Sequence, residues 1–164
     1  MIINQLSVLL ENKPGSLKHI CRLLADNKID ISTLSVADTK DFGILRLIVK
    51  EWERAQKVLL ENGLAVTVTG VVAVEVEDQP GGMCQILDTL DRFAINVEYL
   101  YAFVSPVKGR AVVILRVDAP EVAVAKLSDG QSVKFVGPED IFAENKVFAP
   151  FRFAKIPGWC YGEW

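Results

Sequence analysis

The sequence holds few of the residues from which catalytic and metal sites are built. It has one histidine, His19, and three widely spaced cysteines, Cys21, Cys84 and Cys160. No CxxC spacing occurs, which disfavours a zinc site or a redox-active disulfide. No serine or cysteine is placed to form a hydrolytic triad with His19. We therefore expect reduced structural thiols, no metal, no cofactor and no enzymatic activity.

Long apolar runs and an excess of basic charge are also lacking. No stretch approaches the roughly 20 apolar residues that span a bilayer, and the first residues lack the basic start and apolar centre of a secretory signal. The formal net charge of −3 disfavours a nucleic-acid partner. Because 51% of the 164 residues are hydrophobic, the chain can form a packed core. We expect a cytoplasmic protein with neither a nucleic-acid nor a membrane partner.

The sequence contains an internal repeat. Aligning Pro14-Gly15 with Pro80-Gly81 gives an offset of 80 − 14 = 66 residues, which holds without gaps over about 40 positions. Such regularity indicates a tandem duplication. The identical pairs include Val8 with Val74, Glu11 with Glu77, Ile20 with Ile86, Leu24 with Leu90, Ile29 with Ile95, Leu34 with Leu100, Gly43 with Gly109 and Ile48 with Ile114.

Each copy predicts the same order of elements. After the first Pro-Gly, apolar residues recur at positions 17, 20, 21 and 24, the spacing of an amphipathic helix. The order strand, helix, strand, strand, helix, strand is that of the ferredoxin-like fold. In the first copy we expect strands at 3–10, 29–38, 42–50 and 64–69, a helix after Pro14-Gly15, and a helix at 52–62 ended by Gly63.

The fold class is therefore α+β, with two tandem ferredoxin-like βαββαβ modules whose helices cover one face of each sheet. We expect module 1 at 1–70, module 2 at 71–136, and a short helix followed by an aromatic tail at 137–164. Gly70 is nearly the whole linker.

The Pro-Gly turns join the first strand of each copy to the first helix. Glycine permits a tight turn, and the helix beyond it offers free N–H groups and the positive end of its dipole, which suit an anion. Asn12 and Asp78 in these turns can equally serve as helix caps or shape the turns. From the residues alone, both interpretations stay open.

The stretch LSVLLENKPGSLKHICRLLADNKIDISTLSVADT resembles an ACT domain, a small regulatory module that senses free amino acids. The resemblance rests on ENKPGxL followed by IDI, and it covers about residues 1–136 as two such domains. The first module also resembles the regulatory subunit of acetolactate synthase. The resemblance implies a non-enzymatic regulatory protein that binds a free amino acid between its two modules. The alternative is a regulatory subunit of a catalytic partner enzyme such as acetolactate synthase.

The resemblance also implies the binding residues. In serine-sensing ACT domains, such as that of phosphoglycerate dehydrogenase, the turn of one module and the second strand of its neighbour hold the ligand. The position of the histidine in the serine pattern is Leu10 here, with Val76 its counterpart, so a larger or more apolar amino acid fits at least as well as serine. The implied ligand-binding residues are Asn12, Lys13, Pro14, Gly15, Ser16 and Leu17, Asp78, Gln79, Pro80, Gly81, Gly82 and Met83, and the strand starts Asp30, Ile31, Asn96 and Val97.

The two implied sites differ in charge. If each turn meets the second strand of the other module, Asn12 joins Asn96, while Asp78 joins Asp30. We expect the first pair to hold a neutral zwitterion, and the second to prefer a cationic ligand or to stay empty because two carboxylates repel. Gly82 would let a ligand approach the second turn closely. Family resemblance further implies that the modules join through their second strands and that two chains form a homodimer.

Three other features have more than one interpretation. Tyr99 and Tyr101 alternate on one strand face, where they either pack on a neighbour or wall a ligand pocket. Arg46 is expected to be a solvated charge on the sheet. The segment after Pro138 predicts a short helix. The aromatic tail would be costly to expose and is expected to dock on its own module or on a partner chain; its aromatic residues are Phe148, Phe151, Phe153, Trp159, Tyr161 and Trp164.

Overall fold

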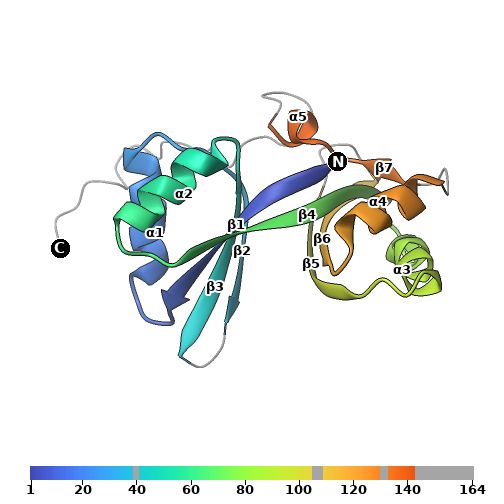
Figure 1. Cartoon of the computed structure of the whole chain (residues 1–164), viewed down its shortest axis with the longest axis horizontal. Coiled ribbons are helices and arrows are strands. Elements are labelled where there is room, and N and C mark those ends of the chain that lie inside the picture. Colours follow the sequence, from blue (N-terminus) through green and yellow to red (C-terminus); the bar gives the residue numbers. More distant parts are fainter. Residues whose placement is uncertain (39–40, 105–108, 130–132, 143–164) are drawn as a thin grey trace.

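The computed structural model describes residues 1–38, 41–104, 109–129 and 133–142. The βαββαβ order occurs twice, as predicted (Figure 1). The predicted aromatic tail lies outside the described residues. The elements are β1 (Ile2–Glu11), α1 (Ser16–Asp26), β2 (Ile31–Asp38), β3 (Phe42–Val49), α2 (Trp52–Glu61), β4 (Val66–Glu77), α3 (Gly82–Arg92), β5 (Val97–Val104), β6 (Arg110–Val117), α4 (Pro120–Asp129), β7 (Lys134–Phe135) and α5 (Pro138–Ile141).

One strand, β4, belongs to both modules. Its residues Val66 to Val72 pair with β1, and Val72 to Glu77 pair with β6, in both cases antiparallel. The whole sheet has the order β2-β3-β1-β4-β6-β5, with β7 paired to β4. Gly70, expected as a linker, lies inside this strand. A Cβ at position 70 would lie 2.9 Å from Cγ2 of Ile2, so glycine lets β1 pass close to β4.

The expectation that the two modules of one chain join through their second strands is wrong. These strands, β2 and β5, lie at the two opposite ends of the sheet order. The physical reason is the continuity of β4, because the last strand of module 1 runs without a break into the first strand of module 2. The expected boundary between residues 70 and 71 falls within this strand.

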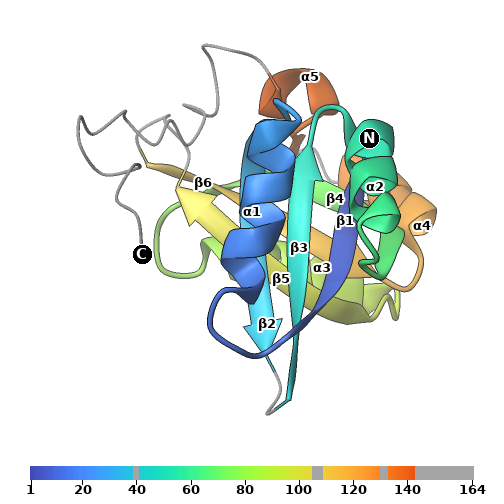
Figure 2. The ribbon, with the colours of Figure 1, turned by 90° about the vertical axis from the view of Figure 1, so that its left-hand side faces the viewer.

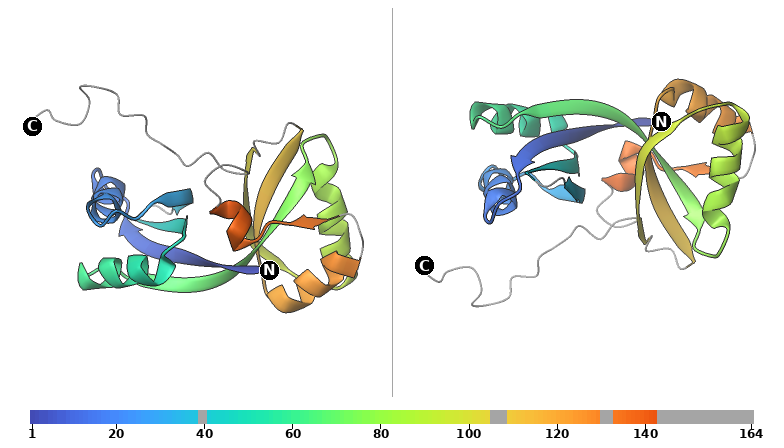
Figure 3. Two further views of the ribbon diagram at one scale, coloured as in Figure 1. Left: turned by 90° about the horizontal axis from the view of Figure 1, so that it is seen from above. Right: turned by 90° about the horizontal axis from the view of Figure 1, so that it is seen from below.

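The two halves of the sheet face each other, and the helices lie on the outside (Figures 1 and 3). Figure 2 looks onto module 1 from its outer side, where α1 and α2 cover the strands. Each pair of helices closes a core of its own, represented by Leu24 and Leu59 in module 1 and by Leu90 and Leu127 in module 2. A third buried cluster, the inter-module cluster, fills the space between the sheets; its members are Ile3, Ile48, Val71, Ala73, Val112, Ile114, Val136 and Ile141.

Helix ends repeat between the modules, but not with the same residues. Gly63, predicted to end α2, has φ +77°. The chain also turns left-handed after α1 at Lys28 (φ 56°) and after α3 at Ala94 (φ 53°). These two positions are equivalent under the 66-residue offset. Side chains are strained in this conformation, which glycine adopts freely.

We expect Ala94→Gly to raise the free energy of unfolding by about 1 kcal/mol, because glycine relieves the left-handed strain. Ala25→Gly, inside α1, is the control and should lower it by about 1 kcal/mol. Urea denaturation followed by circular dichroism measures both. If Ala94→Gly destabilises the protein as Ala25→Gly does, no strain is stored at Ala94.

Candidate functional site

The two Pro-Gly turns have the same backbone geometry. Gly15 and Gly81 are the N-cap residues of α1 and α3, with φ of 92° and 88°, and neither helix has a side-chain cap. Asn12 and Asp78 are therefore not the N-cap residues of these helices. Instead, the backbone N–H of Asn12 donates to the Asp41 carbonyl and that of Asp78 to the Gly109 carbonyl. Both residues thus anchor their turns to the neighbouring hairpin.

Part of each helix start is used by the turn itself. The Ser16 N–H donates to the Lys13 carbonyl over 3.3 Å, and the Gly82 N–H donates to the Gln79 carbonyl over 3.0 Å. The following amides, at Leu17 in α1 and Met83 in α3, are first-turn groups that have no intrahelical acceptor. These amides and the helix dipole are what each turn can offer to a carboxylate.

The side chains of the turns close onto the strand before them. Lys13 forms an ion pair with Glu11, and at the equivalent positions the Gln79 amide donates to the Glu77 carboxylate. The Lys13 and Glu11 side chains are more than half exposed, so their pair contributes little to stability. Both could reorient toward a ligand at low cost.

Gly82 is required by the second turn itself. A Cβ at this position would lie 2.1 Å from the Glu77 carbonyl oxygen. That a ligand approaches the backbone of Gly82 closely stays a prediction.

A pocket lies beside each turn, and each is lined by one module only. Beside the first turn the lining includes Leu10, Lys13, Ser16 and Phe42. The second pocket is more polar, and its lining includes Glu75, Glu77, Gly82, Gln85 and Arg110. Neither lining contains the second-strand start of the other module. The structure of one chain thus does not bring Asn12 to Asn96 in a shared pocket, nor Asp78 to Asp30.

The strand starts lie at the opposite end of each module from its turn. In module 1, Glu11 pairs with Phe42 at the turn end, whereas Ile31 pairs with Val49 at the other end. In module 2 the corresponding pairs are Glu77 with Arg110 and Val97 with Val117. Asp30 and Asn96 are exposed.

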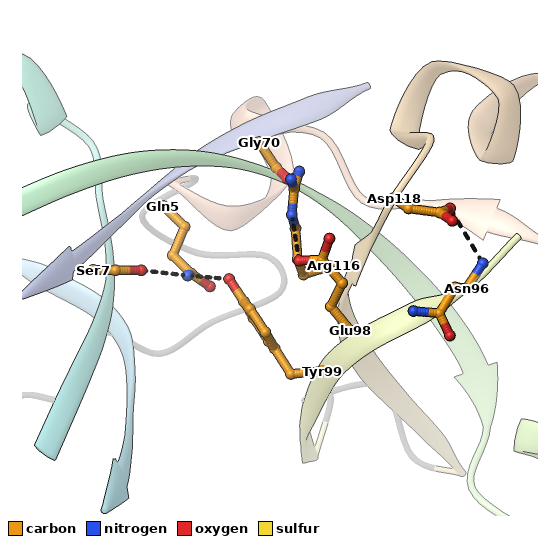
Figure 4. Close-up of polar contacts among 8 residues, drawn as sticks. All are labelled: Gln5, Ser7, Gly70, Asn96, Glu98, Tyr99, Arg116 and Asp118. Carbon is orange, nitrogen blue, oxygen red and sulfur yellow. Dashed lines mark hydrogen bonds and ion pairs between the residues drawn. The ribbon is translucent and has the colours of Figure 1, made fainter.

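Backbone contacts hold Asn96 in place. Its N–H donates to Oδ1 of Asp118 over 3.2 Å, and the Asp118 N–H donates to the Asn96 carbonyl over 3.1 Å (Figure 4). The Asn96 side chain is therefore presented from a fixed backbone.

Both edge strands carry an exposed leucine. Leu34 in β2 and Leu100 in β5 are repeat equivalents, and each is 44% exposed. Val36 in β2 has the same exposure. An edge strand with unpaired backbone groups and exposed apolar side chains is suited to pairing with another chain.

The sequence did not reveal a polar cluster that joins the modules. Gln5 is fully buried; its Nε2 donates to the Tyr99 hydroxyl over 2.7 Å, and the Tyr101 hydroxyl donates to its Oε1 over 3.0 Å. Figure 4 shows Gln5 between Tyr99 and Ser7. Both tyrosines therefore pack against the other module. Burial, with a smaller contribution from Tyr99, raises the pKa of Tyr101 above its ordinary value.

Arg46 belongs to this cluster, and the expectation that it is a solvated charge is wrong. Its guanidinium carbon lies 3.9 Å from the centroid of the Tyr99 ring. This cation–π contact replaces water on one side of the guanidinium. Within the described part of the chain, its buried Nε has no acceptor.

The described residues contain no group of three or more potential metal ligands. Burial raises the pKa of the Cys21 thiol, as expected of a structural cysteine, while Cys84 is exposed. Among the helices of the described ranges, none is both long and apolar enough to cross a membrane.

The ACT domain pair family matches residues 1–143 of the chain. The protein BT0572 of Bacteroides thetaiotaomicron is similar in structure with a TM-score of 0.80 and 33% identity, over 87% of this chain and 97% of that one. The chain therefore belongs to the ACT domain pair family. None of the curated protein sequences matches it significantly.

More distant structures share the fold. The regulatory subunit of aspartate kinase from Thermus thermophilus, in its ligand-free form, has a TM-score of 0.56 and 16% identity, over 77% of this chain and 91% of that one. Aspartokinase alpha and beta subunits give a TM-score of 0.52 and 18% identity, over 79% and 96%. The resemblance of module 1 to the acetolactate synthase subunit stays a prediction.

Proposed function

We propose that this protein is a non-enzymatic regulator that binds a free amino acid between ACT modules, and that a second copy completes the site. One observation supports the proposal: the Pro-Gly turn and the last residue of the open edge strand lie at the same end of the sheet. Glu11, the last residue before the turn, and Asp38, the last of β2, flank the start of β3 at Phe42 and Gly43.

Antiparallel pairing of edge strands would complete the site. If β2 pairs with β5 of a second copy, the start of that β5, with Asn96, comes beside the end of β2 and the Asn12 turn. The same pairing brings the Asp78 turn of the second copy beside Asp30. One interface thus forms both pairs that the sequence suggests, one neutral and one with two carboxylates.

The chemistry of the neutral pair suits an amino acid zwitterion. The first-turn N–H groups of Leu17 and Lys18 donate hydrogen bonds to a carboxylate, while the side-chain oxygens of Asn12 and Asn96 accept hydrogen bonds from an ammonium. Charge-assisted bonds contribute about 1.5–3 kcal/mol each. After the ordering cost, three or four of them give a dissociation constant on the order of micromolar to millimolar. Asp78 with Asp30 favours a cationic ligand or none.

A binding titration tests the proposal. We expect one of the common amino acids to bind in calorimetry and to stabilise the protein by about 2.7 kcal/mol at 100 times its dissociation constant. Asn96→Ala should weaken this binding at least about tenfold, since it removes a charge-assisted bond. Asn62→Ala, which changes an exposed amide at the end of α2, is the control and should bind as the wild type does.

Sedimentation velocity of the same samples reports on the second copy, and the ligand should favour the dimer. Absence of binding by all common amino acids, or equal affinities of the Asn96 and Asn62 variants, contradicts the proposed site. Co-purification with a biosynthetic enzyme whose feedback inhibition then changes would favour the alternative, a regulatory subunit.

A further inference from the structure

An apolar surface on module 1 is left uncovered by module 2. It lies on the inner face of the first sheet, where Leu9 is 48% and Ile44 is 40% exposed. Leu9 and Ile44 are direct cross-strand partners, and Ala37 pairs with Ile44 on its other side. We call Leu9, Ala37 and Ile44 the inner-face patch.

The patch is not an inherited feature of the repeat. Under the 66-residue offset, Leu9 corresponds to Glu75 and Ile44 to Arg110. Glu75 is buried with an ion pair to Lys134. Module 2 thus carries charged residues where module 1 carries exposed apolar ones. This difference indicates that an apolar occupant covers the surface in module 1 and that no such occupant covers the equivalent surface in module 2.

The patch continues a surface that the end of the described chain already occupies. Ile3 and Ile48 lie on the same sheet face as Leu9 and Ile44, by the alternation of β1 and β3, and both belong to the inter-module cluster. Ile141 of α5 is buried in this cluster, and Phe142 packs against it. The chain beyond Phe142 therefore starts from the space between the two sheets.

The following residues have the length and the composition to cover the patch. Residues 143–164 contain six aromatic side chains, at 148, 151, 153, 159, 161 and 164. These 22 residues (164 − 142 = 22) can extend over as much as roughly 70 Å, whereas Ile48 and Ile44 are only about 13 Å apart along a strand.

We propose that the inner-face patch is the docking site of residues 143–164 of the same chain, whose aromatic side chains pack over Leu9 and Ile44. Docking would remove the exposed parts of Leu9 and Ile44 from water. The connection through α5 favours the segment of the same chain over a second copy, because its effective concentration at the patch is high.

Tryptophan fluorescence of the full chain tests the docking. The chain has three tryptophans, and Trp52→Phe leaves only Trp159 and Trp164, both in the segment. In this background we expect blue-shifted emission and weak quenching by acrylamide. Adding Ile44→Lys should shift the emission to that of solvated tryptophan and raise the quenching constant severalfold. Val122→Lys, at a 48% exposed position on α4, is the matched control and should change neither.

A complementary variant changes the segment and keeps the residues of the patch. Trp159→Ser with Trp164→Ser should raise binding of the dye anilinonaphthalene sulfonate, and Ile44→Lys in the same chain should remove this increase. Solvent-like emission in the Trp52→Phe background, or no effect of Ile44→Lys, overturns the proposal. Emission that turns solvent-like as the protein is diluted also overturns it and assigns the patch to a second copy.

Discussion

Gly82→Ala is expected to lower the free energy of unfolding by about 2–4 kcal/mol, the cost of a severe clash in a packed interior. Gly82 is buried, and the added Cβ would lie 2.1 Å from the Glu77 carbonyl oxygen. Relief requires that the turn open, which breaks the hydrogen bond from the Gly82 N–H to the Gln79 carbonyl. Urea denaturation of the full chain measures the change.

The repeat provides the matched control. Ser16 occupies the position of Gly82 in the first module, where a side chain is already accommodated. Ser16→Ala should therefore change the free energy of unfolding by less than about 0.5 kcal/mol. Equal effects of the two substitutions would mean that the second turn tolerates a side chain. The short distance between position 82 and the Glu77 carbonyl would then not affect the free energy of unfolding.

Local features of the fold could be predicted because they depend on residues that are close together in the sequence. The helices follow from apolar residues such as Ile20 and Leu24 at helical spacing, and both are buried. The left-handed backbone of Gly15 and Gly81 follows from the glycines themselves. The junction of the modules could not be predicted, because alternation continues through Val68, Gly70 and Val72 whether one strand or two are present.

The candidate site, too, could be predicted in its local features but not in its long-range contacts. Its turn residues and strand starts can be located from the repeat, but which strand meets which turn depends on long-range pairing. Gln5 was missed because a glutamine at a strand position is typical of a solvated face. Its partners Tyr99 and Tyr101 lie 94 and 96 residues away. Nothing in the residues around Gln5 indicates that a second sheet covers it.

Gln5→Ala is expected to destabilise the chain by about 2–4 kcal/mol, because it leaves a cavity and removes the hydrogen-bond partner of two partly buried hydroxyls. Gln5 is 0% exposed and bonds to both Tyr99 and Tyr101 of the other module. Tyr101→Phe removes one of these bonds and should cost about 1 kcal/mol. The loss should also loosen the modules, so backbone amides of β5 should exchange hydrogen faster while those of β3 remain protected.

Two comparisons separate this cluster from a general effect of losing a glutamine. Gln79→Ala, at an exposed position in the second turn, should change stability by less than about 0.5 kcal/mol. In a double-mutant cycle, Gln5→Ala and Tyr101→Phe should be non-additive by at least about 0.5 kcal/mol, since they remove the same contact. Additive effects would show that Gln5 and Tyr101 are not energetically coupled. The modules would then be held together by β4, the inter-module cluster and the contacts of Tyr99 with Gln5 and Arg46.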